Sequence, residues 1–147
     1  DQSYEALRAS LRDLAAIQEE YGVPVAIENM GAWQVCHFKD PSFLPVLEEE
    51  GLSFCLDIGH ANVNGLLKKF LAAGNPLHVH LHDNNGYSDE HLALGTGCID
   101  FSRVFPRLPS EATWIIEVEK LEAFDESVRF MAQNRRWRRD MNLQPKG

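Results

Sequence analysis

Four short apolar runs, separated by helix-like sequence, constrain the fold of this chain more than any other feature. The runs VPVAIE, LSFCLD, LHVHLH and TWIIEVE place strands near residues 23–28, 52–57, 77–82 and 113–119. Continuous apolar runs are typical of parallel strands that are covered on both faces. Their alternation with helices predicts an α/β fold. Both an open doubly wound sheet and part of a (β/α)8 barrel satisfy this pattern.

The segments between these runs carry the signals of helices. Helices are predicted over residues 3–22, 40–50, 64–73 and 100–108, and a C-terminal helix is predicted from about residue 125. Asp40 and Asp100 are candidate N-caps, Gly22 ends the first helix, and Pro106 shortens or bends the fourth. Because no linker or low-complexity segment interrupts the array, we expect one domain over residues 1–147.

Each apolar run closes on side chains that bind metals. These residues are Glu28, Asp57, His60, His80, His82, Asp83, Glu117 and Glu119. The carboxyl ends of parallel strands meet at one edge of the sheet, where α/β proteins place their sites. Carboxylates with imidazoles suit Mn²⁺, Mg²⁺, Co²⁺ or Zn²⁺, and the lack of a cysteine cluster argues against a structural zinc site. The sequence therefore predicts a catalytic divalent-metal site.

The spacing within each run does not select the ligands. His78, His80 and His82 alternate with apolar residues, so all three side chains point to the same face of the sheet. Glu117 and Glu119 share a face for the same reason. Gly59 permits a sharp turn after the strand, which returns His60 towards the same edge of the sheet. Taken alone, Glu28 is more typical of a surface or helix-capping carboxylate, and His91 of a loop histidine that bonds to the backbone.

Composition narrows the possible functions. The formal charge of −8 repels polyanions and argues against nucleic acid as a partner. Three cysteines without a pairing pattern indicate a reducing, cytoplasmic location. No apolar stretch approaches the roughly 20 residues needed to span a bilayer, so no membrane partner is expected. A small, metal-chelating substrate fits these features better.

Several motifs outside the strand ends have structural interpretations. Gly95-Thr96-Gly97 is a weak phosphate loop, because no strand directly precedes it. Trp33, His37 and Phe38 either line a pocket or cover the mouth of a barrel. The arginines at positions 135, 136, 138 and 139 are interpreted as a solvated helix face.

The order of these motifs resembles the xylose isomerase-like TIM barrels, which include sugar isomerases, epimerases and metal-dependent abasic-site endonucleases. The matching segments are IEN, LDIGHAN, HLHDN, DEHLALGTGCIDF and IIEVE, within residues 20 to 120. The resemblance implies that Glu28, Asp57, His80 and Glu117 bind one catalytic metal, and it implies lesser roles for His82 and Glu119. In the epimerase-like members, the carboxylates that match Glu28 and Glu117 also transfer the proton beside a carbonyl, through an enediolate.

The same resemblance implies roles for three further residues. His60 is expected to bind substrate or a second metal, and Asp89 with His91 matches a pair that binds a further zinc in the endonucleases. The implied function is a divalent-metal-dependent isomerase or epimerase acting on a sugar or related hydroxy-carbonyl compound. The alternatives are a non-catalytic half-barrel module and a zinc-dependent phosphodiesterase acting at abasic sites.

The chain supplies only half of such a barrel. A complete barrel has eight βα units and about 250 residues, whereas four strands are predicted here. Four strands without closure leave unpaired edges and an uncovered interior. We therefore expect a partner, either a second copy of the chain in a homodimer or a missing N-terminal half-barrel.

Overall fold

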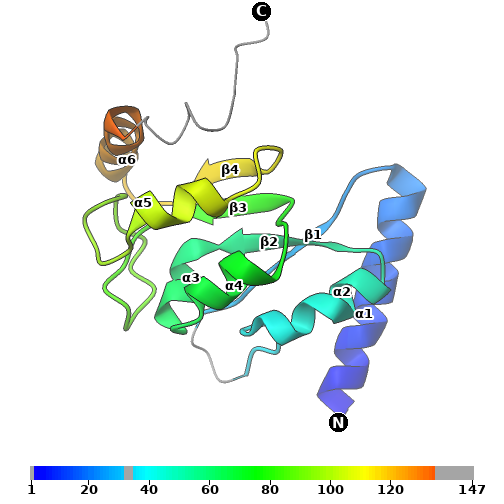
Figure 1. The fold of residues 1–147 in the computed structure, drawn as a ribbon. Coiled ribbons are helices and arrows are strands. Elements are labelled where there is room, and N and C mark those ends of the chain that lie inside the picture. The colour runs from blue at the N-terminus through cyan, green and yellow to red at the C-terminus, as the bar shows by residue number, and fades with distance from the viewer. Residues whose placement is uncertain (1, 32–34, 135–147) are drawn as a thin grey trace, which may run out of the picture.

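The computed structural model describes residues 2–31 and 35–134, in which four parallel strands form one sheet (Figure 1). The strands are β1 (Ala26–Glu28), β2 (Ser53–Asp57), β3 (His78–Leu81) and β4 (Thr113–Ile116), and each pairs with the next along the chain. A doubly wound sheet reverses its strand order at a switch point. The uninterrupted order β1-β2-β3-β4 is instead that of half a β/α barrel, as the sequence predicts.

Helices connect the strands and follow the predicted segments closely. They are α1 (Gln2–Tyr21), α2 (Leu44–Glu49), α3 (Ile58–Val63), α4 (Leu67–Ala73), α5 (Phe101–Val104) and α6 (Leu121–Gln133), with 3-10 turns η1 (Pro41–Phe43) and η2 (Phe105–Arg107). In the described part of the chain, none of these helices has both the length and the apolar character needed to cross a membrane.

Local signals explain most helix boundaries. The side chain of Asp40 caps η1 by accepting a hydrogen bond from the backbone N–H of Ser42 at 2.8 Å. Gly22 ends α1 with a φ of 64°, and Pro106 lies in η2, where the preceding α-helix has already ended. Asp100 is the N-cap residue of α5, as predicted, but its carboxylate accepts from the Ser102 hydroxyl and pairs with Arg103 instead of capping the backbone.

Other boundaries differ from the prediction. The helix expected over residues 64–73 is α4 alone, which begins at Leu67, and α3 before it was not predicted from the sequence. Gly65, with a φ of 67°, separates the two helices. Strand β1 begins at Ala26 and β4 ends at Ile116, so both are shorter than their apolar runs. Each lies at an edge and has one neighbouring strand, which limits how far its ladder extends. Helix α6 begins at Leu121, and the arginine run lies outside the described residues.

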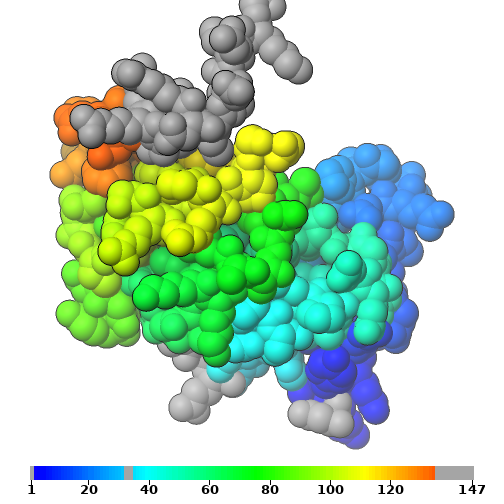
Figure 2. Space-filling model, in the orientation of Figure 1, coloured from blue at the N-terminus to red at the C-terminus, as the bar shows by residue number. Residues whose placement is uncertain are grey.

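The outer face of the sheet carries the hydrophobic core. Phe54 and Leu56 of β2 and Val79 and Leu81 of β3 are buried in one cluster with Phe70 of α4. Figure 1 shows α2, α4 and α5 on this side of the sheet, and in Figure 2 their atoms form a nearly continuous cover. Burial of these large side chains against the helices fixes the sheet from one side.

The inner face of the sheet is open among the described residues. The register pairs Glu28 with Cys55, Cys55 with His78, and Asp57 with His80, so these side chains point to the same side. On β4, Thr113 is exposed and Ile115 retains 50% exposure on this inner face. In a closed barrel this face is the interior, where layers of side chains from opposite strands pack. The open face is therefore the place where the other half of a barrel belongs.

The long connection between β3 and α5 is organised around one buried carboxylate. Asp83 has no solvent exposure, and its two oxygens accept hydrogen bonds from the backbone N–H groups of four residues. The donors are Asn84, Gly95, Gly97 and Ile99, at 2.9, 3.0, 2.9 and 3.1 Å. A Cβ at Gly97 would lie 2.4 Å from an Asp83 oxygen, so the approach requires glycine. The Gly95–Gly97 segment thus binds the buried carboxylate of Asp83 through its backbone N–H groups.

Replacing Asp83 should destabilise the protein without touching the predicted ligands. In Asp83→Asn an amide N–H₂ meets backbone donors, so two acceptor interactions are lost in a buried site. We expect the free energy of unfolding to fall by about 3 kcal/mol, since hydrogen bonds to charged groups contribute about 1.5–3 kcal/mol each. Urea denaturation of the metal-free protein measures this. Tyr87→Phe, at an 83% exposed position in the same connection, should change it by less than about 0.5 kcal/mol; equal effects would refute the assignment.

Candidate metal centre

Three carboxylates from three strand ends surround one imidazole nitrogen. His80 Nδ1 lies 2.9 Å from Glu117 Oε2, 3.5 Å from Glu28 Oε2 and 3.7 Å from Asp57 Oδ2. Glu28 ends β1, Asp57 ends β2, His80 lies in β3, and Glu117 directly follows β4. The backbone N–H of Glu117 still donates to Leu81 O at 3.0 Å, which holds it at the end of the sheet. All four ligands predicted from the sequence therefore lie together.

The polar atoms of this group fit a divalent cation. Among the described residues, Asp57 Oδ2, His80 Nδ1 and Glu117 Oε2 are buried without a hydrogen bond of good geometry. One ligand atom from each of these residues lies within 4.8 Å of the others. Buried polar atoms are normally satisfied, so converging atoms without hydrogen bonds are a sign of an ion site. Three carboxylates and one imidazole suit a hard or borderline divalent ion such as Mn²⁺, Co²⁺, Mg²⁺ or Zn²⁺.

The electrostatics of the protein alone show the same convergence. Contacts with the Cys55 thiol and the Glu28 carboxylate raise the pKa of His80 to about 11, despite its partial burial. Burial would raise the pKa of Glu28, but its close contacts with the imidazoles of His60 and His80 lower it to about 2. The imidazolium of His80 thus occupies the position among the carboxylates where a metal cation would otherwise balance their charge.

Asp57 has a second role in the local structure. It has no solvent exposure, and its Oδ1 accepts a hydrogen bond from His60 N at 2.6 Å as the N-cap of α3. Buried Asn29 holds the backbone of Asp57 on both sides, because it accepts from Asp57 N and donates to Asp57 O. The sequence analysis includes Asn29 only as part of the IEN motif, and these two hydrogen bonds explain why an amide stands there.

A second group of potential ligands lies beside the first. It contains His60, His82, Asp89 and His91, whose ligand atoms lie within 4.8 Å of one another. Asp89 Oδ2 contacts His60 Nε2 at 3.1 Å and His91 Nε2 at 3.2 Å. The rings of His82 and His91 stack with centroids 4.1 Å apart. The three residues predicted to bind substrate or a second metal, His60, Asp89 and His91, are therefore brought together.

His60 connects the two groups. Its Nδ1 lies 2.9 Å from Asn29 O and 3.1 Å from Glu28 Oε1, while its Nε2 faces Asp89. Burial lowers the pKa of His60, but the carboxylates of Glu28 and Asp57 outweigh this and raise it to about 9. A change in the charge of one group therefore directly affects the electrostatics of the other group.

The family resemblance implies a lesser role for His82, whereas the structure makes it a central member of the second group. It has no solvent exposure, and its Nε2 lies 3.1 Å from Asp57 Oδ1. A Cβ at Gly59 would lie 1.9 Å from the His82 ring, so glycine is needed for α3 to pass it. The sequence LHVHLH contains His82, but strand parity alone does not distinguish it from the other two histidines, because all three lie on one face. Glu119 is exposed, in keeping with its lesser role.

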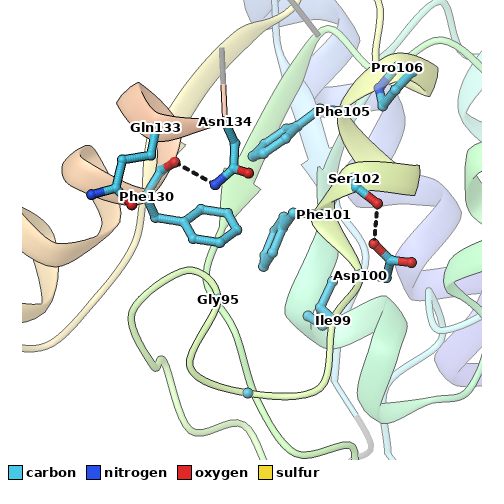
Figure 3. Close-up of a pocket in the computed structure, with 11 residues that line it drawn as sticks. Gly95, Ile99, Asp100, Phe101, Ser102, Phe105, Pro106, Phe130, Gln133 and Asn134 are labelled. Carbon is cyan, nitrogen blue, oxygen red and sulfur yellow. Dashed lines mark hydrogen bonds between the residues drawn. The ribbon is translucent and has the colours of Figure 1, made fainter. Parts of the chain in front are cut away.

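The remaining sequence candidates lie away from this centre. Phe38 is a core residue with 4% exposure, and His37 is exposed. Trp33 lies outside the described residues. A cavity of about 750 Å³ lies between the Gly95–Gly97 segment, α5 and α6 (Figure 3), where Phe101, Phe105 and Phe130 form an apolar wall. None of the candidate ligands lines it.

Comparison with known proteins agrees with this geometry. Residues 1–134 match the family described as the xylose isomerase-like TIM barrel, and the chain belongs to this family. It is 41% identical over 104 residues to the uncharacterized protein MJ1614 of Methanocaldococcus jannaschii, covering 69% of this chain and 41% of that protein. The chain therefore spans less than half the length of this curated relative.

Two solved structures have the same half-barrel within a longer chain. A D-tagatose 3-epimerase-like protein superposes with a TM-score of 0.78 and 30% identity, over 86% of this chain and 52% of that chain. The TTHB071 protein from Thermus thermophilus, in a structure obtained with ZnCl₂ soaking, gives a TM-score of 0.69 and 25% identity over 90% of this chain and 53% of that chain. The described residues thus correspond to about half of each solved chain.

Metal binding at this centre should release a proton. His80, with a pKa of about 11, is protonated at neutral pH in the metal-free protein, and only a neutral imidazole binds a metal. Affinity for Mn²⁺ should therefore rise as pH increases through the neutral range. At pH 7, titration calorimetry in buffers of different ionisation enthalpy should give about one proton released per ion. The variant His80→Gln should no longer release this proton, whereas the control variant His37→Gln, changed at an exposed position, should still release it. Binding heats that are the same in all buffers would contradict the prediction.

Proposed function

We propose that this chain carries the metal-binding half of an isomerase or epimerase that acts on a sugar or a related hydroxy-carbonyl compound. The observation that carries the proposal is the convergence of Glu28, Asp57 and Glu117 on His80 Nδ1. The resemblance of the half-barrel to a D-tagatose 3-epimerase-like protein supports a small sugar as the substrate class.

In this proposal Glu28, Asp57, His80 and Glu117 hold one divalent ion. When bound, such an ion supplies positive charge that orients two substrate oxygens and polarises a carbonyl. Asp57 is suited to holding rather than to proton transfer, because it is fully buried and already caps α3. His80 is suited to the same role, since its ring is fixed among the carboxylates.

Glu28 and Glu117 are the proposed proton carriers. Their side chains keep 32% and 41% exposure, so they are accessible from the open inner face. They follow strands at opposite edges of the sheet, which allows them to approach a substrate from different sides. Removal of the proton beside a carbonyl by one carboxylate gives an enediolate, and return of a proton by the other completes the reaction. Glu28 is ionised at neutral pH, because its pKa is about 2.

His60, Asp89 and His91 have a separate proposed role at the adjoining group. Asp89 lies between the two imidazoles, so the three residues offer both donors and acceptors to a substrate hydroxyl. The same atoms could instead hold a second cation. His60 contacts Glu28 and would align that carboxylate in either case.

The proposed roles predict a difference between two neighbouring carboxylates. Glu117→Gln removes a charged ligand, so Mn²⁺ affinity should fall by at least about tenfold, a loss seen even for residues that only support a metal ligand. Glu119→Gln, at an exposed position beside it, should leave the affinity unchanged. Mn²⁺ binding is measured by electron paramagnetic resonance. Equal affinities in the two variants would mean that Glu117 is not a ligand.

Catalysis is tested on the same variants by deuterium exchange. With Mn²⁺ or Co²⁺ present, the protein should exchange the hydrogen on the carbon beside the carbonyl of at least one ketose in a broad panel. Glu119→Gln should retain this exchange and Glu117→Gln should lose it. Tight Mn²⁺ binding without exchange on any ketose would overturn the isomerase proposal and favour a non-catalytic metal-binding module.

We also propose that a second copy of the chain covers the open inner face. The apolar side chain of Ile115 on this face keeps 50% exposure, although the interior of a closed barrel would bury it. The chain corresponds to about half of each solved relative, so two copies supply the number of strands of one barrel. An isologous pair would contain two copies of the metal centre.

Self-association predicts a solution mass of about twice 16.7 kDa. Ile115→Lys places a charge on the inner face and should shift the protein towards the monomer, whereas Tyr87→Lys, at an exposed loop position, should not. Light scattering after size-exclusion chromatography measures both. A folded monomer at all accessible concentrations would exclude the homodimer and require a different chain as the other half.

A further inference from the structure

A further set of potential metal ligands lies on the inner face, where Cys55 and His78 are level with Glu28 in the sheet and precede Asp57 and His80 along their strands. It consists of Cys55, His78 and His80, and one ligand atom from each lies within 4.8 Å of the other two. Cys55 and His78 are direct partners in the parallel ladder, and His80 is the next residue of β3 on the same face. The register of β2 and β3 therefore brings a thiol and two imidazoles together.

Neighbouring side chains hold these three residues in fixed orientations. Cys55 is buried, with 4% exposure, whereas Cys98, which lies outside the sheet, is exposed. The His78 ring contacts Thr113 Oγ1 on β4 at 2.5 Å and packs edge-on against the His80 ring, with centroids 5.1 Å apart. Partners of this kind fix the orientation of a metal-binding imidazole. The thiol and both rings are thus oriented before any ion binds.

A cavity provides space for the remaining ligands of an ion. It has a volume of about 420 Å³, and all three residues line it together with Glu28, Pro24, Glu111 and Thr113. Zn²⁺ and similar ions commonly keep an open coordination position next to three protein ligands. The cavity supplies such a position on the open side of the set.

We propose that Cys55, His78 and His80 form a site for a thiophilic divalent cation such as Zn²⁺ or Cd²⁺, and that this site competes with the carboxylate centre for His80. Cys55 releases its thiol proton and the His80 imidazolium releases one ring proton to solvent as their bonds to the metal form. Thiolate and imidazole favour softer ions, whereas the set of Glu28, Asp57 and Glu117 favours harder ones. The competition, but not the thiophilic site, rests on the function proposed above.

The competition follows from the chemistry of imidazole. A neutral imidazole has one nitrogen that accepts and one that carries a proton, so His80 can serve one cation at a time. A thiophilic ion that recruits His80 leaves Glu28, Asp57 and Glu117 without their nitrogen ligand. Occupation of the Cys55 site therefore weakens the binding of Mn²⁺ at the carboxylate centre and regulates the proposed activity by metal identity.

Cobalt spectroscopy of the full chain tests the thiophilic site directly. Metal-free protein titrated with Co²⁺ should develop the near-ultraviolet charge-transfer band of a thiolate–cobalt bond. Cys55→Ser and His78→Gln should lose most of this band, while Cys98→Ser and Glu117→Gln should keep it. His78→Gln retains the thiol, so its result is informative even if Cys55→Ser folds poorly. The absence of a band in the parent protein, or a band unchanged in Cys55→Ser, would overturn the proposal.

A second measurement tests the competition. Stoichiometric Cd²⁺ should release Mn²⁺ from the parent protein, with at least a tenfold loss of apparent Mn²⁺ affinity, and should release much less from Cys55→Ser. Equal release from both proteins would mean that Cd²⁺ occupies the carboxylate centre itself, which overturns the competition. A parent protein that never binds Mn²⁺ would refute the carboxylate centre alone, because the cobalt band reports the thiolate site independently.

Discussion

The buried carboxylate of Asp57 joins the sheet, the helix that follows it and both groups of histidines. A charged group without solvent contact is costly unless its oxygens are fully used. One oxygen accepts from the His60 backbone and faces His82, and the other is directed at His80. Asn29 fixes the backbone on either side. Because so many partners meet at one residue, the end of β2 sets the position of the whole centre.

The parallel register determines which residues can join this centre. Glu28, Cys55, Asp57, His78 and His80 face one side of the sheet, while Phe54, Leu56 and Val79 face the other and pack under the helices. The apolar face thus supplies stability and leaves the opposite face free for chemistry. This separation explains how a half-barrel can hold its ligand residues in place although its inner face is uncovered.

The strand order and the four residues that meet at the carboxylate centre could be predicted from the sequence, because apolar runs and the family motifs both point to the strand ends. Parity alone could not choose among His78, His80 and His82. The family resemblance singled out His80, and only the structure shows that His82 meets Asp89 and His91. The break between α3 and α4 at Gly65 and the role of Asp83 depend on tertiary hydrogen bonds and packing. Local patterns do not contain that information.

The hydrogen bonds around Asp83 divide the long connection into parts with different freedom to evolve. The carboxylate ties residue 83 to residues 95–99, and the backbone pairing of Asp83 with Leu92 closes a smaller loop within it. Residues 84–91 therefore project from a fixed base. Insertions or substitutions at the tip of this loop, around Tyr87, can alter what reaches the mouth of the barrel without moving the strand ends. The tip of this loop and the strand ends are in this way held by different contacts.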